Sequence, residues 1–310
     1  MIKFDFNNYD FQYDDKYGLV LGQKRYEGND GGMGDCIGTT CDAYYAYKNS
    51  AFVYGIFACF KFEEKITAYR HPSKKTEPSN DMSRDHIAYA LVAFAKAQWF
   101  GIIKDISKYI SWKISDRYSF TPDLWCYMKA LAGSWFYRQL YYLITIPYMF
   151  FNMLVKKAVY RICNIPPEMT QKEWNDYELK YYKKPTYNWT PFQKKLIKLI
   201  YPMYSLYQLS FMLDVLPNKP AKWLLNRILL PMVDRQNYVV RIMLGDVNYT
   251  REEIYDYKPM WGGRWTAVLS TINDRDVTLI TDEKMLQGNC VDRDLVRILF
   301  EERAGKFNNK

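Results

Sequence analysis

A chain of 310 residues that is 49% hydrophobic and 25% charged is long enough to bury a sizeable core and too apolar to remain disordered. We expect one domain over residues 1–310. The net charge of +9 favours acidic partners, but the lysines and arginines are spread along the chain, so no nucleic-acid motif is indicated. Aromatic residues make up 18% of the chain, which suits sugar-binding walls and subunit contacts, or follows from an AT-rich coding sequence.

The cysteines and the first residues bear on cofactors and compartment. The six cysteines show no CxxC pairing and no histidine at zinc-ligand spacing, so we expect reduced thiols, no metal and no cofactor. The beginning, MIKFDFNNYDFQYDD, lacks the basic and apolar regions of a secretory signal. We expect a protein that is cytoplasmic when synthesised and that acts there, or leaves by lysis or by packaging in a particle.

The pattern of apolar residues favours helices along most of the chain. Residues 1–34 are rich in Tyr, Asp, Asn and Gly and predict loops and short strands. Residues 35–61 predict one long buried helix or a helix pair, and the prolines of residues 70–80 predict a loop. A helix capped by Asp81 or Ser83 then runs through residue 103 with apolar residues on nearly all sides, which is typical of an inner helix.

The second half of the chain continues this helical rhythm. Helices are predicted at residues 124–131, 192–216, 221–232 and 236–244 and near the carboxyl end, with an apolar hairpin over residues 135–161 and residues 166–190 as a surface excursion. Helical hairpins too apolar for a surface indicate two layers of helices. No alternation is long enough for a parallel sheet, and no heptad is sustained. The predicted fold class is therefore mainly all-α, an α/α toroid of helical hairpins with short irregular strands and loops at the amino terminus.

One apolar segment raises the question of a membrane. Residues 140–155 read LYYLITIPYMFFNMLV, about 16 residues against the roughly 20 that a spanning helix needs. Pro147 and Asn152 interrupt the segment, so we expect a buried helix and no transmembrane span. Docking of this segment on a membrane or on a partner surface is the alternative.

Three short stretches concentrate the polar residues that suit chemistry: Gly34-Asp35, Arg70-His71-Pro72 and the residues from Asp81 to His86. The first turn of a helix favours an anion, arginines bind carboxylates or phosphates through two hydrogen bonds, and histidine serves as acid or base near neutral pH. The catalytic candidates are Asp35, His71 and Asp85, and the substrate-binding candidates are Arg70, Arg84 and His86. The competing interpretation is a plain helix cap with a salt bridge between helices.

These stretches resemble a group of bacteriophage and bacterial proteins in which a "GDt.qr" helix precedes an "RHP…SRDQ" segment. The "Pe.w" helix start of that group corresponds here to Thr121-Pro122-Asp123-Leu124-Trp125. The resemblance covers about the first 130 residues and implies a six-hairpin α/α toroid similar to some glycoside hydrolases and polysaccharide lyases. The chain departs from the group at His86, where Gln is usual, and at Cys36-Ile37-Gly38, which replaces more polar residues.

The resemblance also implies roles for particular residues in a central cavity. Asp35 and Asp85 would be the two carboxylates of a glycosidase, whose separation decides the stereochemistry. In a lyase, His71 or a tyrosine would abstract a proton while an arginine neutralises the uronate. Trp261 and Arg264 belong to a Trp-Gly-Gly-Arg-Trp turn that lines the cavity mouth or serves as a packing corner.

Two functions follow as hypotheses from the sequence. The first is a protein that binds an anionic or neutral glycan. It either cleaves this glycan as a glycosidase or lyase, or binds it without cleavage. The second is a non-catalytic virion or assembly component that reuses the toroid and contacts other virion proteins. A membrane-interaction or host-interaction factor is a weaker third. An open cavity with converging side chains favours the first function, and closed, buried salt bridges favour the second.

Overall fold

The computed structural model describes residues 11–23, 36–64, 66–74, 82–109, 122–144, 206–216, 219–232, 238–256 and 290–307, with positions 147, 158, 162 and 190–192. Its elements are β1 (Phe11–Asp14), β2 (Leu19–Gln23), α1 (Cys36–Tyr47), α2 (Ser50–Ala58), β3 (Phe60–Phe62), β4 (Ile66–Ala68), η3 (Pro72–Lys74), α3 (Arg84–Lys96), α4 (Phe100–Tyr109), α5 (Pro122–Leu131), α9 (Leu206–Asp214), α10 (Lys219–Leu229), η5 (Leu230–Met232), α11 (Tyr238–Met243), α12 (Arg251–Tyr255) and α15 (Cys290–Phe307). The prediction of a mainly helical chain with short strands near its amino terminus is confirmed. Within the described ranges, no helix combines the length and the apolar character needed to cross a membrane.

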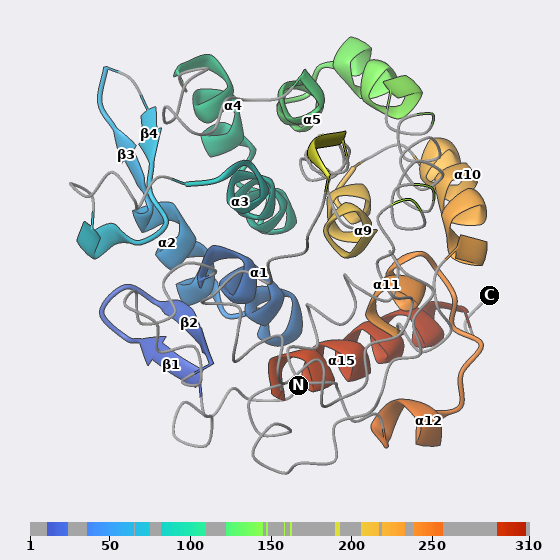
Figure 1. Cartoon of the computed structure of the whole chain (residues 1–310). Coiled ribbons are helices and arrows are strands. Elements are labelled where there is room, and N and C mark those ends of the chain that lie inside the picture. Colours follow the sequence, from blue (N-terminus) through green and yellow to red (C-terminus); the bar gives the residue numbers. More distant parts are fainter. Residues whose placement is uncertain are drawn as a thin grey trace.

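Five helices contact one another in a closed circuit. α1 packs on α3, α3 on α9, α9 on α11, α11 on α15, and α15 returns to α1 (Figure 1). Outside this circuit, α2 packs on α1 and α3, while α4 and α5 pack on α3 and on each other. The helix α3 therefore has neighbours on nearly every side.

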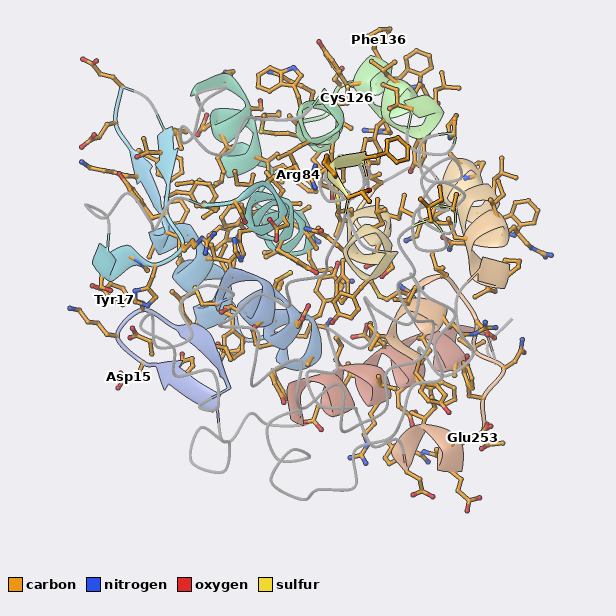
Figure 2. The ribbon with its side chains drawn as sticks, viewed as in Figure 1. Asp15, Tyr17, Arg84, Cys126, Phe136 and Glu253 are labelled. Carbon is orange, nitrogen blue, oxygen red and sulfur yellow. The ribbon has the colours of Figure 1, made fainter. Side chains whose placement is uncertain are left out.

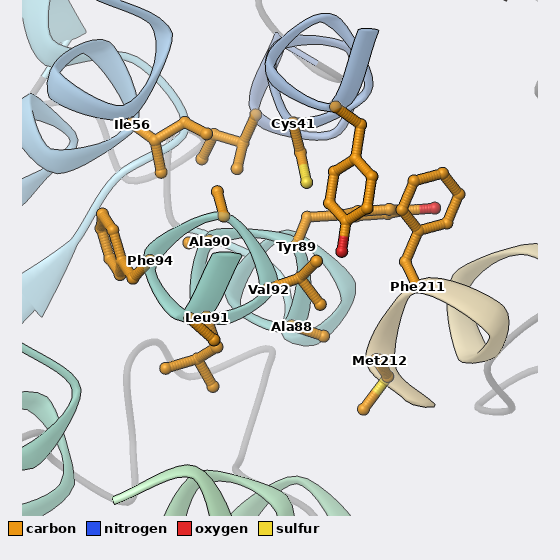
Figure 3. Close-up of a cluster of buried hydrophobic side chains, with 14 of the residues drawn as sticks. Cys41, Ile56, Ala88, Tyr89, Ala90, Leu91, Val92, Phe94, Phe211 and Met212 are labelled. Carbon is orange, nitrogen blue, oxygen red and sulfur yellow. The ribbon is translucent and has the colours of Figure 1, made fainter. Parts of the chain in front are cut away.

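The residues of α3 suit this central place. Every side chain from His86 to Ala95 is buried, and alanines at positions 88, 90, 93 and 95 allow the neighbouring helices to approach closely. Figure 3 shows Tyr89 and Phe211 in the core between α3 and α9, and Ile56 on the α2 side. The apolar pattern all round this helix correctly predicted an inner position.

The predicted helix from residue 84 to residue 103 is two helices, so that prediction was wrong in its length. α3 ends because Gln98 adopts the left-handed conformation, with a φ of 63°. The Trp99 backbone N–H donates to the carbonyl of Phe94 at 2.8 Å, and the two aromatic rings stack with centroids 6.0 Å apart. This hydrogen bond and this apolar contact are those of a Schellman cap, here formed without glycine, so the sequence carried no marker for the break.

Residues 36–58 form the helix pair that was one of the two predictions for this region, followed by a hairpin that the sequence analysis did not predict. Lys48 has a φ of 54°, and the Asn49 side chain accepts a hydrogen bond from the Ala51 N–H at 3.0 Å, which separates α1 from α2. Residues 60–62 then leave the helical conformation, and β3 pairs with β4 in antiparallel register. Three-residue strands are too short to show alternation, which explains why the pattern was missed.

A largely buried carboxylate, Asp214 at the last position of α9, joins several of these helices, and its side chain is 10% exposed. Its oxygens lie 3.0 Å from Lys96 Nζ, 3.1 Å from Lys222 Nζ and 2.7 Å from Arg303 Nη2. The Tyr45 hydroxyl also donates to it at 3.3 Å. Burial raises the pKa of the Asp214 carboxyl, but Lys222, Lys96 and Arg303 outweigh it and hold the pKa far below its ordinary value.

Two of these cations, and Lys48 beside them, bind the carbonyls at helix carboxyl ends. Arg303 Nη1 donates to the carbonyl of Met243, the last residue of α11, at 2.9 Å. Lys222 Nζ donates to the Asp214 carbonyl at 3.1 Å, and Lys48 Nζ donates to the Tyr45 carbonyl in α1 at 2.6 Å. Positive charge is favourable where helix carbonyls lack partners. The helices α1, α3, α9 and α11 therefore all end at one ionic cluster.

The hairpin of β1 and β2 docks on α2 through two glycines. Gly18 has a φ of 71°, and a side chain there would place its Cβ 2.6 Å from the Ala51 carbonyl oxygen. A Cβ on Gly55 would lie 2.5 Å from the carbonyl oxygens of both Gly18 and Tyr17. Because backbone faces backbone, no flexible side chain can yield. This contact fixes the hairpin against the helices.

We therefore predict opposite effects for two helical glycines. Gly55→Ala should lower the free energy of unfolding by about 1–3 kcal/mol, because the hairpin must move to admit the methyl group. Gly101→Ala in α4 is the matched control, since a Cβ there meets nothing within 4 Å. It should leave stability unchanged or raise it by up to about 1 kcal/mol. Urea unfolding of both variants tests this, and an equal effect of the two substitutions would contradict the close-contact explanation.

Candidate functional site

The structure brings the RHP and SRDH stretches to the amino-terminal ends of α1 and α3. The Cys36 thiol at the start of α1 donates to the carbonyl oxygen of Arg70 at 2.8 Å. The Met82 N–H, just before α3, donates to the carbonyl oxygen of Ala68 at 3.2 Å. The helices α1 and α3 pack on each other, and their amino-terminal ends are both bonded to the short segment from Ala68 to Arg70.

His71 lies at the centre of the first polar group. The side chain is 2% exposed, and its Nε2 lies 3.2 Å from Asp14 Oδ2. Its Nδ1 lies 2.7 Å from the Ser73 hydroxyl oxygen, and the edge of the Tyr17 ring packs against the imidazole at a centroid distance of 5.4 Å. The docked hairpin thus supplies both Asp14 and Tyr17.

The hydrogen bonds around His71 define its tautomer. The Ser73 backbone N–H donates to Nδ1 at 3.3 Å, so Nδ1 is an acceptor and the ring proton belongs on Nε2, facing Asp14. The Nε2 to Oδ2 contact is at ion-pair distance but is not aligned as a regular hydrogen bond, so its attraction is chiefly electrostatic. The carboxylate orients the ring, and the ring accepts the proton of an exposed serine hydroxyl.

His86 belongs to a second polar group at the start of α3. The Ser83 hydroxyl donates to Asp85 Oδ1 at 2.6 Å and lies 2.5 Å from His86 Nδ1. A hydroxyl has one proton, so when it donates to the carboxylate it accepts from Nδ1–H, and Nε2 of His86 carries the lone pair. Ser83 stands at the cap position of α3, but its hydroxyl joins these two side chains and does not cap a backbone N–H. The Gln208 side chain from α9 donates to the Asp85 carbonyl at 2.9 Å.

The predicted site residues therefore fall into two hydrogen-bonded groups. His86 is 3% exposed and Ser83 6%, whereas Asp85 and Arg84 are half-buried. In Figure 2, Tyr17 lies at the left edge beside the hairpin, and Arg84 lies nearer the middle of the view. Arg70 is half-buried, and its carbonyl also accepts from the Cys59 thiol at 3.7 Å.

The predicted residues Asp35, Trp261 and Arg264 lie outside the described residues. Among the residues that sequence reasoning missed, Asp14 and Tyr17 stand in a segment read as loops and short strands, and nothing in their spacing links them to His71. The role of Ser73 could have been predicted, because its position two residues after His71 permits a side-chain hydrogen bond.

The described cysteines and acidic groups show no metal site. Cys36, Cys41, Cys59 and Cys126 are free and buried. Within the described ranges, no three His, Cys, Asp or Glu side chains are arranged to hold a metal ion. Comparison of the chain with protein-family models, curated proteins and solved structures found no match.

The two histidines should show opposite tautomers in solution. At a pH where both rings are neutral, we expect the proton on Nε2 of His71 and on Nδ1 of His86, because their serine partners impose opposite roles. Long-range proton–nitrogen correlation spectra distinguish the tautomers, and each ring serves as the reference for the other. Ser73→Ala should alter the His71 signals and leave those of His86 unchanged. The same tautomer at both rings would contradict the hydrogen-bonding described.

Proposed function

We propose that this protein binds a glycan at the amino-terminal ends of α1 and α3, within an α/α toroid. The observation that carries the proposal is that the start of α1 and the residue before α3 both bond to the segment that leads into the RHP stretch, through the Cys36 to Arg70 and Met82 to Ala68 hydrogen bonds. The closed circuit of five helices supports the toroid, as does the common end of α1, α3, α9 and α11. A toroid has an inner layer of helices that run in the same direction.

The described side chains suit recognition of an acidic sugar. Arg70 and Arg84 are half-buried, so their guanidinium groups combine access with restricted motion. A guanidinium binds a carboxylate through two charge-assisted hydrogen bonds. Asp85, also half-buried, is an acceptor for sugar hydroxyls, and it lies in the first helical turn, where a negative charge is favourable. A neutral glycan would use the acceptors and not the arginines.

The geometry favours binding over cleavage. His71 and His86 are buried and held by serines, which suits a fixed scaffold better than proton transfer to a substrate. Cleavage by a glycosidase needs a second carboxylate opposite Asp85, and the candidate is Asp35. The Asp35→Asn variant therefore tests the cleaving form of the proposal separately from the binding form.

A second candidate function is a structural component of a virion or another assembly. The burial of both histidines within hydrogen-bonded groups favours it, because such groups stabilise a loop whether or not a ligand is present. A bacteriophage or bacterial source, and a place in a virion, are suggested by the resemblance of the RHP and SRDH stretches. In this candidate the aromatic excess serves contacts between subunits.

The proposal predicts that binding depends on the arginines. Uronate-containing and neutral oligosaccharides are titrated into the full chain by calorimetry, and we expect binding to the uronate panel. Arg84→Ala should weaken it at least roughly tenfold, since a charge-assisted pair contributes about 1.5–3 kcal/mol. Arg251→Ala, an exposed change in α12, is the matched control and should have no effect. Absence of binding to both panels would reject the glycan proposal and favour the structural candidate.

A further inference from the structure

The exposed apolar side chains of this protein are concentrated in one part of the chain. Among the described residues, twelve large hydrophobic side chains are exposed, and eight of them fall between residues 135 and 224. Single exposed apolar residues are ordinary on a soluble protein, but a concentration of them marks an interaction surface.

The charges of the chain are distributed just as unevenly. Residues 124–233 contain fifteen lysines and arginines but only five carboxylates, a net charge of +10. The whole chain has a net charge of +9, so the remaining residues contribute −1. Basic residues occur throughout, and the imbalance arises because carboxylates are scarce in this region. One of the five carboxylates, Asp214, is largely buried and is paired with Lys96, Lys222 and Arg303.

The helical residues 135–144 show how the apolar surface is presented. Tyr141 is 1% exposed, and its ring packs against Tyr127 of α5 at a centroid distance of 5.2 Å, which fixes one side of this helix to the core. The other side presents Trp135, Phe136 and Leu143, which are 68%, 62% and 71% exposed. Figure 2 shows Phe136 at the outer edge of the molecule, pointing away from it. No carboxylate occurs in this helix.

The helix α10 repeats this arrangement. Lys222 faces inward and binds Asp214, which anchors the helix, while Trp223 and Leu224 are 60% and 47% exposed. The Arg227 guanidinium lies 5.0 Å from the centroid of the Trp223 ring, so a cation accompanies the exposed indole. α10 also lacks carboxylates. In Figure 1, the green helix that contains residues 135–144 and the amber α10 both lie along the upper right rim.

We infer that these two helices form a docking surface for an anionic lipid bilayer. Tryptophan and phenylalanine are favoured at the boundary between headgroups and acyl chains, and aliphatic side chains such as Leu143 and Leu224 gain by leaving water. Lysines and arginines without neighbouring carboxylates are attracted to anionic headgroups. The aliphatic residues decide between a bilayer and a nucleic acid, because a phosphate backbone rewards cations and stacked aromatic rings but not exposed leucines.

Vesicle flotation with the full chain tests this inference. Vesicles of phosphatidylcholine alone are compared with vesicles that also contain phosphatidylglycerol, at about 0.1 M and about 1 M salt, where the screening length is roughly 10 Å and 3 Å. We expect binding to the anionic vesicles only, and weaker binding at high salt. Trp223→Ser with Leu224→Ser, or Trp135→Ser with Phe136→Ser, should each weaken it roughly tenfold or more.

The control pair has similar chemistry outside the surface. Phe62→Ser with Phe100→Ser removes side chains that are 39% and 44% exposed on β3 and α4, and it should leave vesicle binding unchanged. The inference is overturned if the protein does not float with anionic vesicles, or if the control pair weakens binding as much as the other pairs. It is also overturned if two results occur together: a DNA duplex displaces the protein from the vesicles, and the apolar substitutions leave the affinity for DNA unchanged.

Discussion

The Asp214 carboxylate is the interaction on which the arrangement of the helices depends. Asp214 is the last residue of α9. Its carboxylate binds Lys96 at the end of α3, Lys222 in α10 and Arg303 in α15. A carboxylate buried in this way is costly unless its partners are in place, and each cation would be equally costly without the carboxylate. The cluster is therefore satisfied only when α3, α9, α10 and α15 are placed so that their charges meet. Because the cations also bind helix carbonyls, the positive charge is shared among the helix ends.

The two ends of the helix layer differ in character. The carboxyl ends meet in a charge cluster whose members all have partners, which suits stability. The amino ends of α1 and α3 carry the polar groups around His71 and His86, together with the half-buried side chains of Arg84 and Asp85, which suits recognition. The contact between Gly18 and Gly55 serves both the packing and the polar groups, because it fixes on α2 the hairpin whose Asp14 pairs with His71. The two outer helices with exposed apolar residues are a third region: α10 contacts this layer through Lys222, and the helix of residues 135–144 packs on α5 through Tyr141.

The sequence predicted what depends on local pattern and missed what depends on distant contacts. Apolar residues around the whole of α3 correctly predicted a central helix, and Ser83 was correctly expected at its cap position, although the Ser83 hydroxyl bonds two side chains and no backbone N–H. The break at Gln98 was missed because a left-handed residue other than glycine leaves no trace in the sequence. The stretches that contain His71 and Asp85 were identified from residue types alone. Their partner Asp14 was not, because the pairing needs the hairpin to fold back on α2.

Equilibrium unfolding of Asp214→Asn tests the central role of this carboxylate most directly, with the exposed Asp105→Asn as its matched control. At neutral pH the account predicts that Asp214→Asn lowers the free energy of unfolding by roughly 3–5 kcal/mol, while the control changes little. Because the pKa of Asp214 is lowered in the folded protein, its stabilisation is complete above the ordinary value of 3.8 and is lost as the pH falls further. The difference in the free energy of unfolding between wild type and Asp214→Asn should therefore become smaller in acid. A variant as stable as the control at neutral pH would contradict the account.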